Sequence, residues 1–144
     1  MPQLTPYLIF PGTCAEAIRF YETAIGGKIE VLMTIGNSPA SPHCPAEDAD
    51  RIMHARLVLP GGGLLMAGDC PSTMPFPARQ TAHVALSYDT VAEAEKVFAA
   101  LSVGSEVEMP MAPSFWAKAF GMCTDRFGIG WMVNGELLPL PKVS

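Results

Sequence analysis

The chain has 144 residues, of which 49% are hydrophobic and 16% are charged, and it carries a formal net charge of −5. This length suits one domain with a substantial core, and this composition excludes an intrinsically disordered chain. No apolar run approaches the roughly 20 residues of a membrane-spanning helix, and the 9 Lys and Arg residues form no cluster, so we expect a soluble globular protein that binds neither membrane nor nucleic acid.

The N-terminal segment MPQLTPYLIF has no basic residue, and its apolar run is too short for a secretory signal. We therefore expect a cytoplasmic protein.

The four cysteines, Cys14, Cys44, Cys70 and Cys123, form no C-x-x-C pair, which predicts free thiols rather than a zinc site or a redox dithiol. Cys14 lies at a predicted helix start, which can lower a thiol pKa, although a small structural residue is the simpler interpretation.

An internal repeat gives the predicted elements in chain order. The segment PYLIFPGTCAEAIRFYETAIGGKIEVLM, from Pro6, aligns without gaps with HVALSYDTVAEAEKVFAALSVGSEVEMP, from His83. Each copy begins with an apolar run of strand length, at 7–10 and 84–88, and continues with helical spacing. The predicted buried helix faces are Ala17, Phe20, Tyr21 and Ala24 in the first copy, and Ala94, Val97, Phe98 and Leu101 in the second.

Glycines mark the predicted ends of both helices. Gly26 and Gly27 follow the first helix, and Gly104 follows the second, as is usual just beyond a helix C-terminus. A strand is predicted next in each copy, at about 28–35 and 106–111.

Each half then continues with a predicted β-hairpin. The runs IMHARLVL and GLLMAGD flank glycines, and AFGMCTDRFGIGWMVN contains two runs around DRFG. Aligning the two hairpins places Met66 on Met132. The sequence therefore predicts two βαβββ modules, at about 4–70 and 80–136, within a single domain spanning residues 1–144.

The segment GNSPASPHCPAEDAD, residues 36–50, has no counterpart in the second half. Its three prolines among small polar residues predict an exposed loop, in which His43 is expected to be solvent-exposed. A loop of this kind could also act as a lid, and the sequence leaves its role open.

Two tandem βαβββ modules resemble the vicinal oxygen chelate superfamily, which includes glyoxalase I, extradiol dioxygenases, fosfomycin-modifying enzymes and bleomycin resistance proteins. The stretches YLIFPGTCAEAIRFYETAIGGKI, HARLVLPGGGLLMAGD and SFWAKAFGMCTDRFGIGWMVN resemble its PhnB-like branch. The resemblance implies an α+β fold whose eight strands form a curved open barrel, with the ligand in the concave cavity and both helices on the convex side. It also implies a homodimer, because modules of this superfamily pair within one chain or across two.

The resemblance further implies where a metal would bind. In the metal-dependent relatives, His, Glu or Gln side chains from several strands hold a divalent ion that binds two substrate oxygens. Carried over to this chain, these positions fall on Pro6, on Met66 or a neighbour, on His83, and on Trp131 or Met132. Because His83 is the one usual metal ligand among these residues, we expect no tightly bound metal and no other cofactor. The alternative is that the protein is a lyase or dioxygenase of the glyoxalase type that binds a divalent metal.

Strand alternation selects further candidates. If His83 faces the cavity, Ala85 and Ser87 do so too, and His54 and Arg56 in MHARLVL share a face. The opposite face of that strand is the predicted core, with Met53, Ala55, Leu57 and Leu59. Arg56 could bind a carboxylate or phosphate, and His54 or His83 could act as a catalytic base. The simpler interpretation of His54 and Arg56 is that both are solvated residues of an exposed sheet.

The predicted ligand contacts are Arg56, His54, His83, Trp116, Trp131, Met66 and Asn134. The tryptophans could form an apolar wall for a planar ligand, although a role in the core is the simpler interpretation of both. Asp69 and Asp125 lie at strand ends beside turns, where carboxylates usually accept hydrogen bonds from backbone amides.

The function predicted from these residues is the binding of a small organic molecule, anionic with an apolar body, by a PhnB-like protein. Some members of this branch are labelled methyltransferases, but PGGG at 60–63 lies between two predicted strands. A glycine-rich nucleotide loop should instead open a helix. The sequence leaves open the reaction, and whether His54 and His83 share one cavity.

Overall fold

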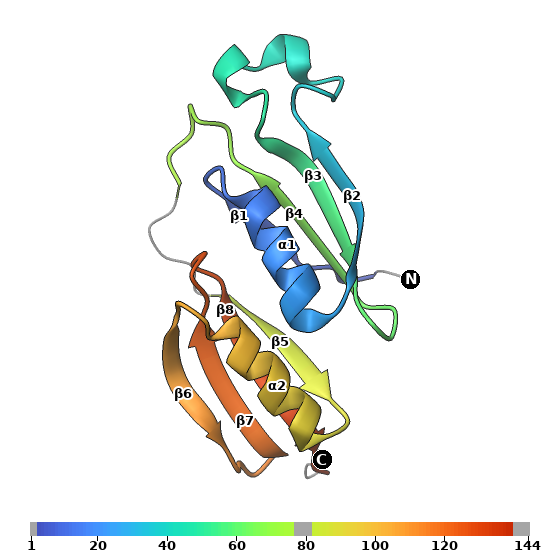
Figure 1. Ribbon diagram of the computed structural model, residues 1–144, viewed down its shortest axis with the longest axis vertical. Helices are drawn as coiled ribbons and strands as arrows, with labels where there is room; N and C mark the ends of the chain where they lie inside the picture. Colours follow the sequence, from blue (N-terminus) through green and yellow to red (C-terminus); the bar gives the residue numbers. More distant parts are fainter. Residues whose placement is uncertain (1–2, 77–81, 140–144) are drawn as a thin grey trace, which may run out of the picture. The chain divides into compact units, whose positions relative to one another are not determined.

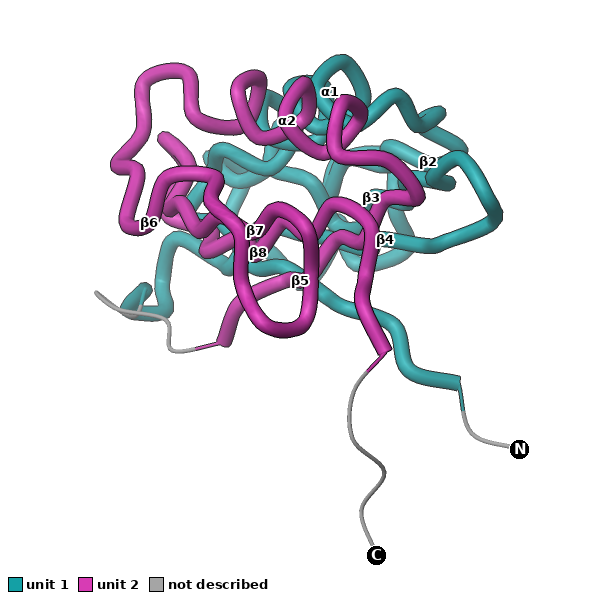
Figure 2. The backbone as a smooth tube through the Cα atoms, turned by 90° about the horizontal axis from the view of Figure 1, so that it is seen from below, with its two compact units in different colours: residues 1–78 teal, residues 79–144 magenta. Residues whose placement is uncertain are grey.

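The computed structural model describes residues 3–76 and 82–139. The chain divides into two compact units, residues 1–78 (unit 1) and residues 79–144 (unit 2), which are coloured separately in Figure 2. The predicted start of the second module, near residue 80, lies outside the described residues. No helix in the described part of the chain is long and apolar enough to cross a membrane.

Unit 1 has one helix and one four-stranded sheet (Figure 1). Its strands lie in the order β1-β4-β3-β2, with β1 parallel to β4 and the other pairs antiparallel. Its elements are β1 (Tyr7–Phe10), α1 (Cys14–Ile25), β2 (Lys28–Thr34), the 3-10 turns η1 (Ser41–His43) and η2 (Ala46–Asp48), β3 (Ile52–Val58) and β4 (Leu64–Asp69).

Unit 2 repeats this arrangement with the order β5-β8-β7-β6, and β5 is parallel to β8. Its elements are β5 (His83–Tyr88), α2 (Val91–Leu101), β6 (Glu106–Ala112), β7 (Ala117–Thr124) and β8 (Gly130–Leu137). The prediction of two βαβββ modules and an α+β fold is confirmed. The eight strands form two four-stranded sheets, one in each unit, and neither sheet closes into a barrel.

Each helix covers one face of its own sheet because one side of it is apolar (Figure 1). The buried face of α2 contains the four residues predicted from the sequence: Ala94, Val97, Phe98 and Leu101. The buried face of α1 is rotated from the prediction and contains Cys14, Ala17, Ile18, Tyr21 and Ile25. Phe20 and Ala24 are half-buried instead, so the predicted face of α1 was only partly correct.

A β-bulge changes which residues of β3 are buried. Ala55 and Leu57 lie in the core as predicted, but Met53 is 43% exposed and Ile52 is 2% exposed. The pairing of β2 with β3 shifts by one residue at this point, because Met33 pairs with His54 while Thr34 pairs with Ile52. The shift breaks the alternation that placed Met53 in the core.

The strand register also corrects the predicted alignment of the first strands. Tyr7 pairs with Met66 and Ala85 pairs with Met132, and these methionines are equivalent in the hairpins. Tyr7 is therefore equivalent to Ala85, and Pro6 to Val84 rather than to His83. The ungapped alignment failed because β1 and α1 are joined by residues 11–13, whereas β5 and α2 are joined by residues 89–90.

The segment 36–50 contains two 3-10 turns and is anchored by a buried carboxylate. Asp48 is 1% exposed; its Oδ2 accepts a hydrogen bond from the Ser72 amide at 3.1 Å, and its Oδ1 lies 3.4 Å from Arg51 Nε. His43 is exposed as predicted. The glycine-rich residues 60–63 join β3 to β4, so they form a hairpin turn and not the start of a helix, also as predicted.

Candidate functional site

The sheet face opposite α1, here called the open face of unit 1, carries a tyrosine and histidine pair. The Tyr7 hydroxyl lies 3.3 Å from His54 Nδ1, and the two rings stack with their centroids 5.8 Å apart. Gly68 makes room for this contact, because a Cβ there would lie 2.9 Å from the Tyr7 hydroxyl. Burial, and then repulsion from the Cys14 thiolate that forms only at high pH, raise the pKa of Tyr7, so its hydroxyl remains a hydrogen-bond donor.

Arg56 lies on the same open face, in the same cross-strand row as Tyr7. Met66 of β4 pairs with Tyr7 on one side and with Arg56 on the other. Arg56 Nε lies 3.5 Å from Glu30 Oε1, but the two groups are not aligned for a hydrogen bond, and this buried nitrogen has no hydrogen-bond partner. Beside this pair, Lys28, Glu30 and Val58 line a pocket of about 230 Å³. Unit 1 thus holds a cation whose hydrogen-bonding capacity is not satisfied by the protein.

The open face of unit 2, opposite α2, carries a second polar cluster. His83 Nε2 lies 3.8 Å from Glu108 Oε2, and the other oxygen of Glu108 accepts a hydrogen bond from the Thr124 hydroxyl. His83 Nε2 is buried without a hydrogen-bond partner. The His83 ring lies over Gly130, where a Cβ would be 2.5 Å from the ring. The predicted candidate His83 therefore reaches over Gly130 of β8 toward Glu108 of β6.

Trp116 and Asn134 were predicted separately, and the structure brings them together. The Trp116 indole nitrogen donates a hydrogen bond to Asn134 Oδ1 at 2.9 Å. The indole also makes edge contacts with Phe115 and Phe120, each with a centroid distance of 4.8 Å. Because Phe115 is 78% exposed, this aromatic group can be reached from solvent, as a ligand-contacting wall requires.

Trp131 does not support its predicted contact with a ligand. It is 0% exposed, in the core of unit 2, and its indole nitrogen donates to Asp125 Oδ2 at 2.8 Å. Strand alternation explains the outcome, because Trp131 faces α2 while its neighbour Met132 lies on the open face with Ala85.

The two aspartates predicted to be structural accept backbone hydrogen bonds. Asp69 Oδ1 accepts from the amides of Gly12 and Cys14, both at 2.9 Å, and its Oδ2 accepts from Ile52 at 2.7 Å. Asp69 thus joins the end of β4 to the starts of α1 and β3. The prediction of amide-binding roles for Asp69 and Asp125 is confirmed.

Cys14 is expected to be unreactive in the folded protein. Burial, and then the nearby Asp69 carboxylate, raise the pKa of its thiol to about 12, so almost none is present as the reactive thiolate near pH 8. Iodoacetamide at pH 8 should modify the half-buried Cys44 and Cys70 first, and Cys14 only after unfolding in urea, as read by peptide mass spectrometry. Equal rates for Cys14 and Cys44 in the native protein would contradict this prediction.

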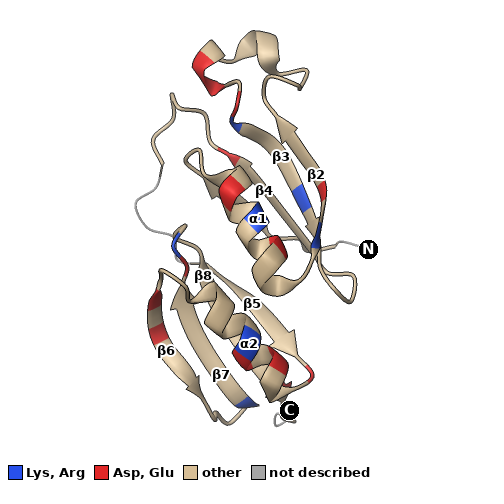
Figure 3. Cartoon of the chain, in the orientation of Figure 1, with Lys and Arg blue, Asp and Glu red and all other residues tan. Residues whose placement is uncertain are grey.

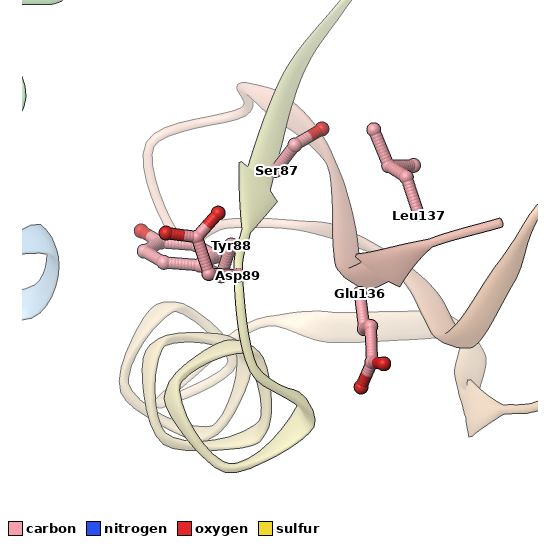
Figure 4. Close-up of a pocket in the computed structure, with 5 residues that line it drawn as sticks. All are labelled: Ser87, Tyr88, Asp89, Glu136 and Leu137. Carbon is pink, nitrogen blue, oxygen red and sulfur yellow. The ribbon is translucent and has the colours of Figure 1, made fainter.

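A further cavity lies at the end of β5. It has a volume of about 270 Å³ and is lined by Ser87, Tyr88, Asp89, Glu136 and Leu137 (Figure 4). Glu136 has a φ of 56°, a left-handed conformation that is uncommon for a residue other than glycine. In the close-up the Ser87 and Glu136 side chains point to opposite sides.

The charged residues do not assemble a metal centre among the described residues. The Lys and Arg positions are scattered over both units (Figure 3), and no three described His, Cys, Asp or Glu side chains gather as metal ligands would. His83 and Glu108 are two such residues, short of the three protein ligands that a tightly held divalent ion takes.

Tyr7, Glu30, Glu108 and Thr124 were not identified from the sequence. The two glutamates occupy equivalent bulges, Glu30 between Ile29 and Val31 and Glu108 between Val107 and Met109. A bulge re-aims a side chain, so strand alternation does not show which face it occupies. A gapped alignment of the two modules would have placed these glutamates opposite each other.

Comparison with known proteins agrees with this architecture. The chain matches the family described as Glyoxalase/Bleomycin resistance protein/Dioxygenase superfamily over residues 3–133. It is 46% identical to the crystal structure of protein PA1353 from Pseudomonas aeruginosa, with 93% of this chain and 97% of that chain covered and a TM-score of 0.84.

Two further relatives extend this similarity. Protein YjdN of Escherichia coli is 31% identical over 139 residues, which cover 91% of this chain and 93% of YjdN. A Bacillus cereus structure described as a putative 3-demethylubiquinone-9 3-methyltransferase, PhnB protein, is 22% identical, with 92% and 98% coverage and a TM-score of 0.73. The chain therefore belongs to the glyoxalase/bleomycin resistance protein/dioxygenase superfamily, as the resemblance predicted.

Proposed function

We propose that this protein binds a small organic molecule with a carboxylate or similar anionic group, and that the open face of unit 1 holds that group. The observation that carries the proposal is Arg56, whose buried Nε has no hydrogen-bond partner. Glu30 lies 3.5 Å from this Nε without a hydrogen bond, and a planar guanidinium matches a carboxylate, which can accept two parallel hydrogen bonds from it. Tyr7 and His54 supply two more polar groups on the same face.

The neighbourhood of Arg56 also suits an apolar ligand body. Met66 lies between Tyr7 and Arg56 in one row of the sheet, and Ile9, two residues after Tyr7, is 39% exposed. The adjoining pocket of about 230 Å³ has room for a small molecule. Methyl transfer is not part of this proposal, because the glycine-rich residues 60–63 form a hairpin turn.

Matched probes test the proposed anion site. Benzoate should bind to the wild type and benzamide, its neutral isostere, at least tenfold more weakly, as measured by thermal stabilisation and amide NMR shifts. Arg56→Ala should weaken benzoate binding tenfold or more, because the ion pair with bidentate hydrogen bonds is lost. Arg19→Ala removes the same charge from an exposed position on α1 and is the control.

Two results would contradict the proposal. In one, benzoate and benzamide bind equally well, so that the charge has no role. In the other, Arg19→Ala weakens benzoate binding as much as Arg56→Ala does, which would indicate general electrostatic attraction without a site.

A further inference from the structure

The His83 cluster of unit 2 has a geometry that distinguishes the two nitrogens of the ring. Nε2 is buried and faces Glu108 Oε2 at 3.8 Å. The His83 side chain as a whole is 25% exposed, so its exposed part lies on other atoms of the side chain. A carboxylate beside Nε2 favours the proton on that nitrogen and leaves Nδ1 with a free electron pair.

The surroundings hold both members of this pair in place. The Thr124 hydroxyl donates to Glu108 Oε1, which fixes the carboxylate. Gly130 of β8 admits the His83 ring, because a Cβ there would be 2.5 Å from Cδ2 and 2.7 Å from Nε2. The other strands of the sheet thus present Glu108 from β6, Thr124 from β7 and Gly130 from β8. Glu108 is the titratable side chain among these three, and Glu106 of β6, which is exposed, pairs with Thr124 in the same row.

We propose that Thr124, Glu108 and His83 form an acid–base site, in which His83 Nδ1 accepts a proton from a weakly acidic hydroxyl of the bound molecule, such as a phenol or enol. The ligand O–H bond breaks and an N–H bond forms at Nδ1. The ligand oxygen becomes an anion, the imidazole becomes a cation, and no oxidant or reductant is needed. Glu108 is a positioning residue that keeps Nε2 protonated and stabilises the cation.

The ligand class follows from the residues next to His83 on the open face. Ala85, Met132 and Met122 pair in one row across β5, β8 and β7, and methionines adapt their shape to apolar groups. A hydroxyl attached to an apolar, planar body would therefore meet both the base and an apolar surface. This assignment rests on the proposed binding of a small organic molecule but uses residues of unit 2 alone.

The first test reads the ring nitrogens of His83 directly. Two-dimensional ¹H–¹⁵N correlation of the imidazoles, at a pH where they are neutral, should show the proton on Nε2 in the wild type. Glu108→Ala should abolish this preference, whereas Glu95→Ala, which removes an exposed carboxylate of α2, should not. Thr124→Val serves as a second variant should Glu108→Ala fail to fold. A proton on Nδ1 in the wild type would overturn the proposal.

The second test uses 4-nitrophenol, whose ionised form is coloured. Below the pH at which the free phenol ionises, wild-type protein should raise its ionised fraction severalfold, and His83→Gln should abolish that rise. His43→Gln, in the exposed segment of unit 1, is the control and should keep it. No rise with the wild type, or an equal rise with His83→Gln, would overturn the assigned base. Benzoate binding with these results would retain the proposed function and remove this inference alone.

Discussion

Replacing Asp125 by alanine is expected to destabilise unit 2 by about 3 to 5 kcal/mol, because three donors lose a charged, buried acceptor. Asp125 is 4% exposed. Its Oδ1 accepts from the amides of Phe127 at 2.8 Å and Ile129 at 3.0 Å, and its Oδ2 accepts from Trp131 Nε1 at 2.8 Å. Urea unfolding followed by tryptophan fluorescence would measure the change in free energy of unfolding.

A double-mutant cycle would isolate the part of this effect that passes through the indole. In a Trp131→Phe background, Asp125→Ala should cost about 1 to 2 kcal/mol less, because no indole N–H is left without its acceptor. Asp89→Ala, at an exposed position, should change the free energy of unfolding by about 0.5 kcal/mol or less. Equal losses of unfolding free energy for Asp125→Ala and Asp89→Ala would show that the turn at residues 125–129 is stable without the Asp125 carboxylate.

The second large effect is expected at Gly135, where α2 lies against β8. A Cβ at this position would be 2.9 Å from Ala94 Cβ and 2.9 Å from Val91 Cα. Since Val91 Cα is backbone, the helix itself would have to move, and Gly135→Ala should destabilise unit 2 by about 2 to 3 kcal/mol. The same unfolding experiment measures the loss, and amide NMR shifts should change most in the first turn of α2.

Gly63 offers the matched control. A Cβ at Gly63 would have its nearest contact at 3.5 Å, with Leu59 Cδ1, which is an ordinary packing distance. Gly63→Ala should therefore cost about 1 kcal/mol or less. If Gly135→Ala were as mild as Gly63→Ala, then α2 could shift away from β8 at little cost, and the tight helix packing would not limit the stability of unit 2.

Several features followed from the sequence because they depend on residues close together in the chain. The period-two and helical patterns marked all eight strands and both helices, and the buried face of α2 was predicted in full. The turn chemistry of Asp69 and Asp125 was also predictable, since an aspartate beside a turn has backbone amides within reach of its side chain. The glycine-rich hairpin at 60–63 was predicted on the same local grounds.

The pairing of site residues depended on the tertiary structure. His54 meets Tyr7, and His83 faces Glu108, across strands that are distant in sequence. The register that brings these residues together includes bulges at Glu30, Glu108 and Met53.

Each bulge adds one residue to one strand, which reverses the alternation that a sequence pattern assumes. The one-residue difference between the two strand-to-helix connections likewise moved Pro6 out of register with His83. The sequence by itself therefore determined the two βαβββ modules and the buried face of α2, because these follow from local periodicity. Which side chains meet on the open faces was decided by strand register, which only the assembled sheets define.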